Sequence, residues 1–165
     1  MRIKIGCIPA AGEGRSINSL PLTKVLPKPM LPIGNKPILE YVVLNMKKMG
    51  VKTIFMIIGH KKDVIMDYFE DGSDFGVDIH YIYQKEPKGI AHAISLARDY
   101  ITDNFITILG DDFTISKSLT NLLHLFFKKD AIVVEGVVEE EDLDVIKDTC
   151  CVKLDEDKRI VEIIE

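Results

Sequence analysis

The chain has 165 residues, of which 47% are hydrophobic and 28% are charged. This length suits a single domain with a core that needs no covalent cross-link, and the composition excludes an intrinsically disordered chain. No apolar run approaches the roughly 18 residues of a membrane span, and the short apolar run at the start is unlike a secretory signal. Because Cys7, Cys150 and Cys151 cannot all pair and form no CxxC, we expect free thiols and a cytoplasmic protein.

The net charge of −5 is unevenly distributed along the chain. Acidic residues concentrate in 135–165, whereas residues 10–39 carry Arg15, Lys24, Lys28 and Lys36 against Glu13 alone. A cationic segment in an acidic protein indicates a focused anion site, and we expect neither a nucleic-acid nor a membrane partner. The alternative is a set of lysines that merely solvate a loop.

The spacing of apolar residues, glycines and prolines predicts the secondary structure in chain order. We expect a strand at 2–9, a loop at 10–34, a helix at 37–49 capped by Asn35, a strand at 53–58, a helix at 61–69, a turn at 72–76, a strand at 77–83, a helix at 89–101, a strand at 104–109, a helix at 119–129, a strand at 131–138, and a hairpin of 149–154 and 159–164. The continuous apolar runs at 53–58 and 104–109 predict strands buried on both faces.

This alternation of strands and helices predicts an α/β fold of Rossmann-like type, with three α/β/α layers and a mostly parallel mixed sheet. Such sheets bind ligands beyond the carboxyl ends of their strands. The loop at 10–34 follows the first strand there, and Asp111 follows the strand at 104–109. We therefore expect the basic loop and Asp111 to share one edge of the sheet.

The loop at 10–34 combines glycines that permit close approach of a phosphate with prolines that restrict the backbone. Six of the seven prolines lie in or beside it, and two of them flank Lys28. A lysine held in this way suits repeated contact with a phosphate in one pose. The glycines of AGEG alone are a weak signal, since the Walker pattern and the three-glycine dinucleotide fingerprint are both absent. A plain turn and a solvated lysine are the alternatives.

Polar residues also follow two later strands. Gln84 comes directly after one strand and five residues before Gly89, and an amide beside a glycine suits the edge of a nucleobase. Asp111 and Asp112 follow a buried strand and are natural Mg²⁺ ligands, although a helix-capping role is an alternative. His92 falls in the first turn of the helix expected at 89–101, near this edge, and the four histidines show no metal-ligand spacing.

Four segments together resemble the sugar-1-phosphate nucleotidylyltransferases, which are GT-A-like enzymes. They are GEGR, PLTKVLPKPMLPIGNKP, QKEPKGIAHA and LGDD, in the family's order and at family-like separations over nearly the whole chain. The stretch at 71–112 is most similar to the glucose-1-phosphate thymidylyltransferases. The resemblance implies transfer of a nucleoside monophosphate from dTTP or UTP to a sugar 1-phosphate, with Mg²⁺ as cofactor and release of pyrophosphate, and family members are often homo-oligomers.

The resemblance also implies roles for individual positions. Arg15, Lys28 and Asp111 would be catalytic, and Asp111 would hold Mg²⁺. The nucleotide would be bound by Ala10, Ala11, Gly12, Gly14, Gln84, Gly89 and Asp112, with Gln84 and Gly89 at the pyrimidine edge. Cys151 and Glu165 would contact the sugar.

Three departures from the family pattern bear on the expected function. Gly14 is followed at once by Arg15 and Ser16, either of which could occupy the family's arginine position, and we favour Arg15. Cys151 stands where the family has a glycine against the sugar, which keeps choline phosphate, GlcNAc 1-phosphate and mannose 1-phosphate as alternative acceptors. The sequence ends at Glu165, before the family's second metal-binding aspartate. We therefore expect residues 1–165 to be the nucleotide-binding part of a longer enzyme, with a non-catalytic regulatory subunit as the alternative.

Overall fold

The computed structural model describes residues 2–12, 21–116, 118–142, 144, 146 and 150–164. The chain divides into two units, residues 1–134 and residues 135–165, and each is considered by itself.

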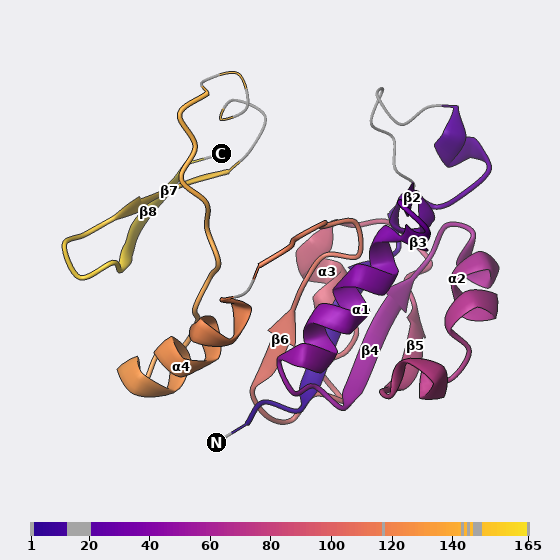
Figure 1. The fold of residues 1–165 in the computed structure, drawn as a ribbon, viewed down its shortest axis with the longest axis horizontal. Coiled ribbons are helices and arrows are strands. Elements are labelled where there is room, and N and C mark those ends of the chain that lie inside the picture. The colour runs from indigo at the N-terminus through magenta and orange to yellow at the C-terminus, as the bar shows by residue number, and fades with distance from the viewer. Residues whose placement is uncertain are drawn as a thin grey trace. The chain divides into compact units, whose positions relative to one another are not determined.

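The first unit is built on a sheet of four parallel strands in the order β5-β4-β1-β6 (Figure 1). These strands are β1 (Ile5–Ala10), β4 (Thr53–Ile58), β5 (Asp78–Tyr83) and β6 (Phe105–Thr107). In the middle of β1, Cys7 lies opposite Phe55 on one side and opposite Thr107 on the other. Because all three pairings are parallel, each connection must cross back over the sheet, which confirms the predicted α/β fold.

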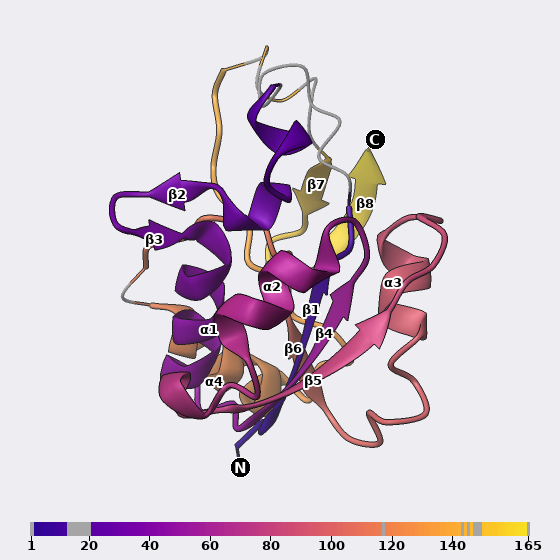
Figure 2. The same ribbon diagram turned by 90° about the vertical axis from the view of Figure 1, so that its right-hand side faces the viewer.

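Helices cover both faces of this sheet. Helices α1 (Ile38–Lys48) and α2 (Lys62–Phe69) lie on one face, and α3 (Ile90–Ser95) lies on the other (Figure 2). Alternate residues of a strand point to opposite faces. Ile8 accordingly belongs to the core beneath α1 and α2, whereas Cys7 belongs to the core beneath α3. The three-layer architecture is therefore confirmed.

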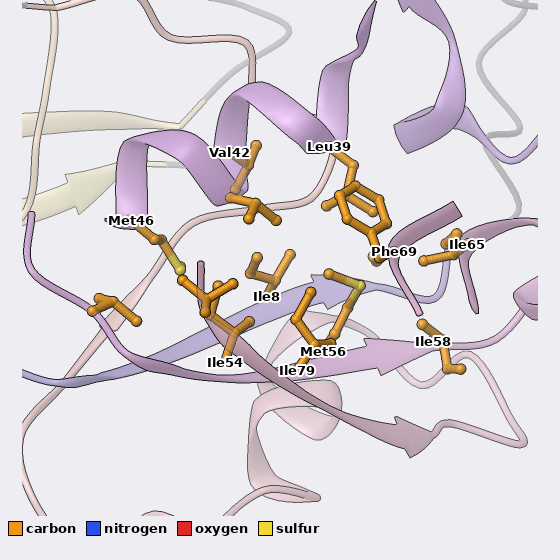
Figure 3. Packing of buried hydrophobic residues seen from close by; sticks show 14 of the residues in the cluster. Ile8, Leu39, Val42, Met46, Ile54, Met56, Ile58, Ile65, Phe69 and Ile79 are labelled. Atoms are coloured by element: carbon orange, nitrogen blue, oxygen red, sulfur yellow. The ribbon is translucent and has the colours of Figure 1, made fainter. Parts of the chain in front are cut away.

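The larger core lies between α1 and the central strands. Leu39, Val42 and Met46 recur on one face of α1 and point toward Ile8 and Met56, as Figure 3 shows. All five side chains are fully buried. Burying a side chain of this kind stabilises the fold by about 1.5–3 kcal/mol. This packing holds the start of α1 at the carboxyl edge of the sheet.

Residues 21–37, the described stretch before α1, contain more regular structure than the predicted loop. Two single-turn 3-10 helices, η2 (Leu22–Lys24) and η3 (Lys28–Met30), precede a small antiparallel ladder of β2 (Pro32–Ile33) and β3 (Lys36–Pro37). Asn35 lies in the turn of this ladder, so it does not cap α1, whose N-cap is Pro37 without a side-chain hydrogen bond. The expected Asn35 cap is thus wrong because the β2–β3 turn uses that residue.

Three further expectations differ from the structure. The helix at 89–101 ends at Ser95 and continues as turns. Strand β6 is shorter than 104–109, and it is partly exposed because it forms an edge of the described sheet. No strand forms at 131–138, where Ile132 is 96% and Val138 is 84% exposed. This run has strand-forming residues but no pairing partner among the described residues, and β-propensity depends on such a partner.

The end of the first unit and the second unit each contain an expected element. Helix α4 (Leu119–Lys129) has the predicted bounds, and none of its residues is buried. The second unit contains the predicted hairpin, formed by β7 (Cys151–Leu154) and β8 (Ile160–Ile164) as an antiparallel pair. The Asp155 carboxylate closes its turn by accepting hydrogen bonds from the backbone N–H groups of Asp157 and Arg159, at 2.9 and 2.8 Å.

Candidate functional site

The carboxyl edge of the parallel sheet gathers most of the polar residues that the sequence singled out. Ala11 and Gly12 follow β1, Gln84 follows β5, and Asp111 and Asp112 lie shortly beyond β6. Because all four strands are parallel, these positions share one edge. The contact between Lys28 and Asp111 confirms the predicted common edge for the described part of the basic loop and the acidic pair.

The Lys28 ammonium forms an ion pair with the Asp111 carboxylate, with 2.8 Å between Nζ and Oδ2. Both side chains are about one-third exposed, at 37% and 33%. Lys28 begins η3, and Pro29 and Met30 of the same turn are buried. The backbone N–H of Met30 donates to the Pro27 carbonyl at 2.8 Å, which closes the turn. A rigid, anchored turn thus presents a cation that remains accessible from solvent.

The segment that carries Asp111 is held against the end of β1. The Gly110 N–H donates to the Pro9 carbonyl at 2.9 Å. A Cβ atom at Gly110 would lie 2.8 Å from the Cβ of Ala10, so this close approach requires a glycine. The Asp112 carboxylate accepts a hydrogen bond from the Thr114 hydroxyl at 3.1 Å, and no helix forms at 113–116 for it to cap. The alternative of a helix-capping aspartate is therefore wrong.

Helix α1 contacts both segments that meet at the ion pair. The Tyr41 hydroxyl donates to the Ile33 carbonyl at 2.9 Å, downstream of Lys28. The Tyr41 ring packs edge-on against Phe113, with centroids 5.0 Å apart. One helical turn later, the Asn45 amide donates to the Thr114 carbonyl at 2.8 Å. Tyr41 and Asn45 were not predicted as supporting residues, and the one signal for them in the sequence is their spacing of four on a predicted helix.

The chain at Ala10, Ala11 and Gly12 runs between two glycines. Gly110 lies beside Ala10, and a Cβ atom at Gly59 would lie 2.7 Å from the Ala11 carbonyl oxygen. That oxygen also accepts a hydrogen bond from the His60 N–H at 3.2 Å. Ala10 and Ala11 are buried, whereas a Cβ atom at Gly12 would meet no described residue within 4 Å. Gly12 therefore leaves backbone accessible at this edge.

Gln84 lies in a tight hydrogen-bonded group beyond β5. Its backbone N–H donates to the Ile58 carbonyl at 2.9 Å, and the residue is only 6% exposed. Its side-chain nitrogen lies 2.9 Å from His92 Nδ1 and 3.4 Å from the Gly89 carbonyl oxygen. Gly89 has φ 90°, a conformation that favours glycine, and a Cβ atom there would have no neighbour within 4 Å among the residues that the structure describes. The structure thus brings Gln84 and Gly89 together, as predicted from the sequence.

The remaining predicted positions divide into two groups. Gly14, Arg15, Ser16 and Glu165 lie outside the described residues. Cys151 begins β7 in the second unit and is partly buried, with its sulfur 4.0 Å from the Ile146 carbonyl. All three cysteines are free thiols, as expected, and burial raises the pKa of Cys7 to about 11.

The donor set at the edge is compatible with magnesium. Within the described part of the chain, no three His, Cys, Asp or Glu side chains gather into a metal-binding group. Magnesium often takes one or two protein carboxylates and completes its shell with water and substrate phosphates. The partly exposed Asp111 carboxylate, adjacent to a cation that could receive phosphate, fits such a ligand.

Among the described residues, no helix is long and apolar enough to span a bilayer.

Fold and site together define an α/β protein that offers a charged, glycine-lined edge to a ligand. Comparison of the sequence with known families matches residues 5–165 to the nucleotidyl transferase family. The chain therefore belongs to this family.

Individual relatives agree with this assignment. The Haloferax volcanii low-salt glycan biosynthesis nucleotidyltransferase Agl11 is 38% identical over 123 residues, which are 73% of this chain and 34% of that protein. A UTP–glucose-1-phosphate uridylyltransferase of Bacillus subtilis is 34% identical over 166 residues, covering 85% of this chain and 56% of that protein. This chain thus spans between a third and just over half of the length of these relatives.

A solved structure extends the likeness to the whole fold. A Bacillus anthracis protein assigned as a glucose-1-phosphate thymidylyltransferase, in complex with a sucrose, superposes with a TM-score of 0.80 at 27% identity. The match covers 99% of this chain and 64% of that one. Both sequence and fold therefore relate the chain to sugar-1-phosphate nucleotidyltransferases.

Proposed function

We propose that this chain is the nucleotide-binding part of an enzyme that transfers a nucleoside monophosphate from UTP or dTTP to a sugar 1-phosphate. The observation that carries the proposal is the Lys28–Asp111 ion pair at the carboxyl edge of the sheet. A fixed cation beside a carboxylate provides for the two needs of a bound triphosphate, which are charge neutralisation and a metal ligand. The related uridylyltransferase and glycan biosynthesis nucleotidyltransferase support this reaction class.

In the proposed reaction, a phosphate oxygen of the sugar 1-phosphate attacks the α-phosphorus of the nucleotide. The bond from the α-phosphorus to the bridging oxygen of the β-phosphate breaks, and pyrophosphate leaves with the electron pair of that bond. Lys28 neutralises negative charge on the phosphates, and Arg15 is assigned to the same task. Magnesium, when bound at Asp111, supplies further neutralisation of phosphate charge.

The ion pair suits a change of partner during substrate binding. Exposed ion pairs contribute little to stability, so Lys28 can leave Asp111 at small cost when a triphosphate arrives. Gly12 offers accessible backbone, and Ala10 and Ala11 hold that backbone in place. Asp112, oriented by Thr114, lies next to this group.

The base would lie near Gln84 and Gly89. The Gly89 N–H makes no hydrogen bond among the described residues, and open space lies beside this glycine. Uracil and thymine each offer an N–H between two carbonyl oxygens. Gln84 and Gly89 can therefore pair with that edge as acceptor and donor, which supports UTP and dTTP as substrates. The free thiols support the cytoplasmic location proposed from the sequence.

A substrate panel tests the proposal. The protein is mixed with UTP, dTTP, CTP or GTP, and with glucose 1-phosphate, GlcNAc 1-phosphate, mannose 1-phosphate or choline phosphate, and release of pyrophosphate is measured. We expect pyrophosphate from UTP or dTTP together with a sugar 1-phosphate. Exclusive use of choline phosphate would overturn the sugar assignment, for which Cys151 and Glu165 are the proposed contacts. Nucleotide binding without pyrophosphate from any pair would overturn the enzyme assignment in favour of a regulatory subunit.

A further inference from the structure

We propose that His92 is a positioning residue that fixes the orientation of the Gln84 carboxamide and thereby selects bases with an N–H at their edge. This inference rests on the proposed function, because it assigns a determinant of base specificity to the same site. The Gln84 side chain makes the hydrogen bonds that carry it.

The Gly89 carbonyl determines which end of the amide faces it. A carbonyl oxygen can only accept a hydrogen bond, so the Gln84 atom 3.4 Å from it must be the NH₂ nitrogen. The same nitrogen lies 2.9 Å from His92 Nδ1. Since that nitrogen donates, Nδ1 must accept, and the imidazole proton must reside on Nε2. The Gln84 NH₂ group thus donates to both the Gly89 carbonyl and His92 Nδ1.

This arrangement leaves the Gln84 carboxamide oxygen available. Both contacts of the side chain use its nitrogen, and the oxygen has no hydrogen bond among the described residues. Among the described side-chain polar atoms, Thr23 Oγ1 alone is buried without a hydrogen-bond partner. Because the Gln84 oxygen also has no partner, it must retain some contact with solvent. Gln84 consequently presents a fixed acceptor, although a free amide could offer either end.

A fixed acceptor distinguishes pyrimidines by their hydrogen-bonding edges. Uracil and thymine carry N3–H, which can donate to the Gln84 oxygen. Cytosine carries an unprotonated N3, whose lone pair would face that oxygen. Rejecting the wrong partner in this way is a common source of specificity. Without an acceptor at residue 92, only the longer contact of 3.4 Å to the Gly89 carbonyl orients the Gln84 amide, so the amide rotates more readily and can offer its NH₂ group to cytosine.

The first test measures binding by isothermal titration calorimetry with UTP and CTP. We expect the unmodified protein to prefer UTP by about tenfold to a hundredfold, the cost of an unmatched polar pair. His92→Leu should reduce this preference at least about fivefold, mainly by improving CTP binding, because the hydrophobic side chain no longer accepts from Gln84. His92→Gln, whose carbonyl oxygen can accept, should restore most of it. His124→Leu, an exposed histidine on α4, is the matched control and should keep the full preference.

The second test needs no nucleotide. The ¹⁵N spectrum of the His92 imidazole in the unmodified protein, recorded in mildly alkaline buffer, should show the Nε2–H tautomer. Backbone ¹⁵N–¹H spectra of the variants check that each of them is folded. An Nδ1–H tautomer, or an unchanged UTP preference in folded His92→Leu, would overturn the inference while leaving the proposed function standing. Failure of the unmodified protein to bind UTP or dTTP would overturn the proposed function, and the base-selection inference with it.

Discussion

Lys28 and Asp111 are far apart in the chain, yet their charged groups meet at 2.8 Å. One side chain comes from a proline-flanked turn after β1, and the other comes from the segment after β6. Helix α1 contacts both segments, through Tyr41 and Asn45. The contact between these charges therefore depends on the folded sheet and on helix α1. It can be tested by mutating the two charged residues or the residues of α1 that support them.

Replacing Lys28 with alanine should slow nucleotidyl transfer about 10²- to 10³-fold, because one well-placed charge-stabilising group contributes that much. The fold should remain, since the Lys28 side chain is partly exposed. Pyrophosphate release gives the rate, and circular dichroism checks the fold. Lys48→Ala is the control, because Lys48 is an exposed lysine near the end of α1, at the opposite edge of the sheet. Near-normal transfer by Lys28→Ala would remove Lys28 from the mechanism.

Gly12→Ala should change nucleotide affinity, whereas Gly59→Ala should change the stability of the fold. The new methyl group at Gly12 meets nothing within 4 Å in the described part of the chain, so stability should hold while nucleotide affinity falls through contact with the ligand. The methyl group at Gly59 would lie 2.7 Å from the Ala11 carbonyl oxygen, so we expect a loss of about 1–3 kcal/mol of stability. Urea unfolding and nucleotide titration measure the two properties. Unimpaired nucleotide binding by Gly12→Ala would contradict the proposed position of the phosphates.

Asn45→Leu tests the support that α1 gives to the Asp111 segment. The substitution keeps the branching and the number of heavy atoms of this buried side chain but removes the donor to the Thr114 carbonyl. We expect the free energy of unfolding to fall by about 1–2 kcal/mol. We also expect weaker binding of magnesium and nucleotide together, because the segment that carries Asp111 loses an anchor. Tyr41→Phe, which removes only the hydrogen bond to Ile33, should have a smaller effect on this binding. Equal binding by Asn45→Leu and the unmodified protein would show that this anchor is dispensable.

Glu40 should make the stability of the protein depend on acid pH. Burial opposes ionisation of this carboxylate, but hydrogen bonds from Lys36 and Tyr68 and the Lys36 charge outweigh burial and lower the Glu40 pKa from its ordinary 4.5. A lowered folded-state pKa contributes stability above the ordinary pKa and loses it as the pH falls through the folded value.

The measurement is urea unfolding at neutral pH and at several values below 4.5. Glu40→Gln should lose stability at neutral pH and show a shallower further loss in acid than the unmodified protein. Glu139→Gln, at an exposed position, serves as the control and should follow the unmodified protein. Parallel acid profiles for Glu40→Gln and the unmodified protein would rule out this contribution.

Local patterns predicted the elements that depend on local forces. The apolar run of β4 and the amphipathic spacing of α4 have the bounds that periodicity predicts. The common edge of Lys28 and Asp111 was also predictable, because parallel strands place all their carboxyl ends together. The roles proposed for both residues stay predictions.

Other features depend on contacts that no local pattern contains. The residues at 131–138 have strand-forming side chains, but strand formation needs a partner, and none is present in the described chain. The hydrogen bonds from Asn45 to Thr114 and from Gln84 to His92 depend on tertiary packing. The sequence places Gln84 and His92 in separate elements, and it gives no sign of which end of the amide meets the imidazole.

The central position of β1 also determines how late the sheet can be completed. Its neighbours β4 and β6 begin at Thr53 and Phe105, so β1 has no hairpin partner nearby in the sequence. It can pair only after segments that are distant in the chain have come together. Sheets assembled from such remote pairings fold slowly. Cys7 has no exposed surface at the centre of β1, so we expect its thiol to lose reactivity toward alkylation during refolding only as β4, β6 and α3 pack around it. The rate at which Cys7 is alkylated therefore reports when the sheet is completed around β1.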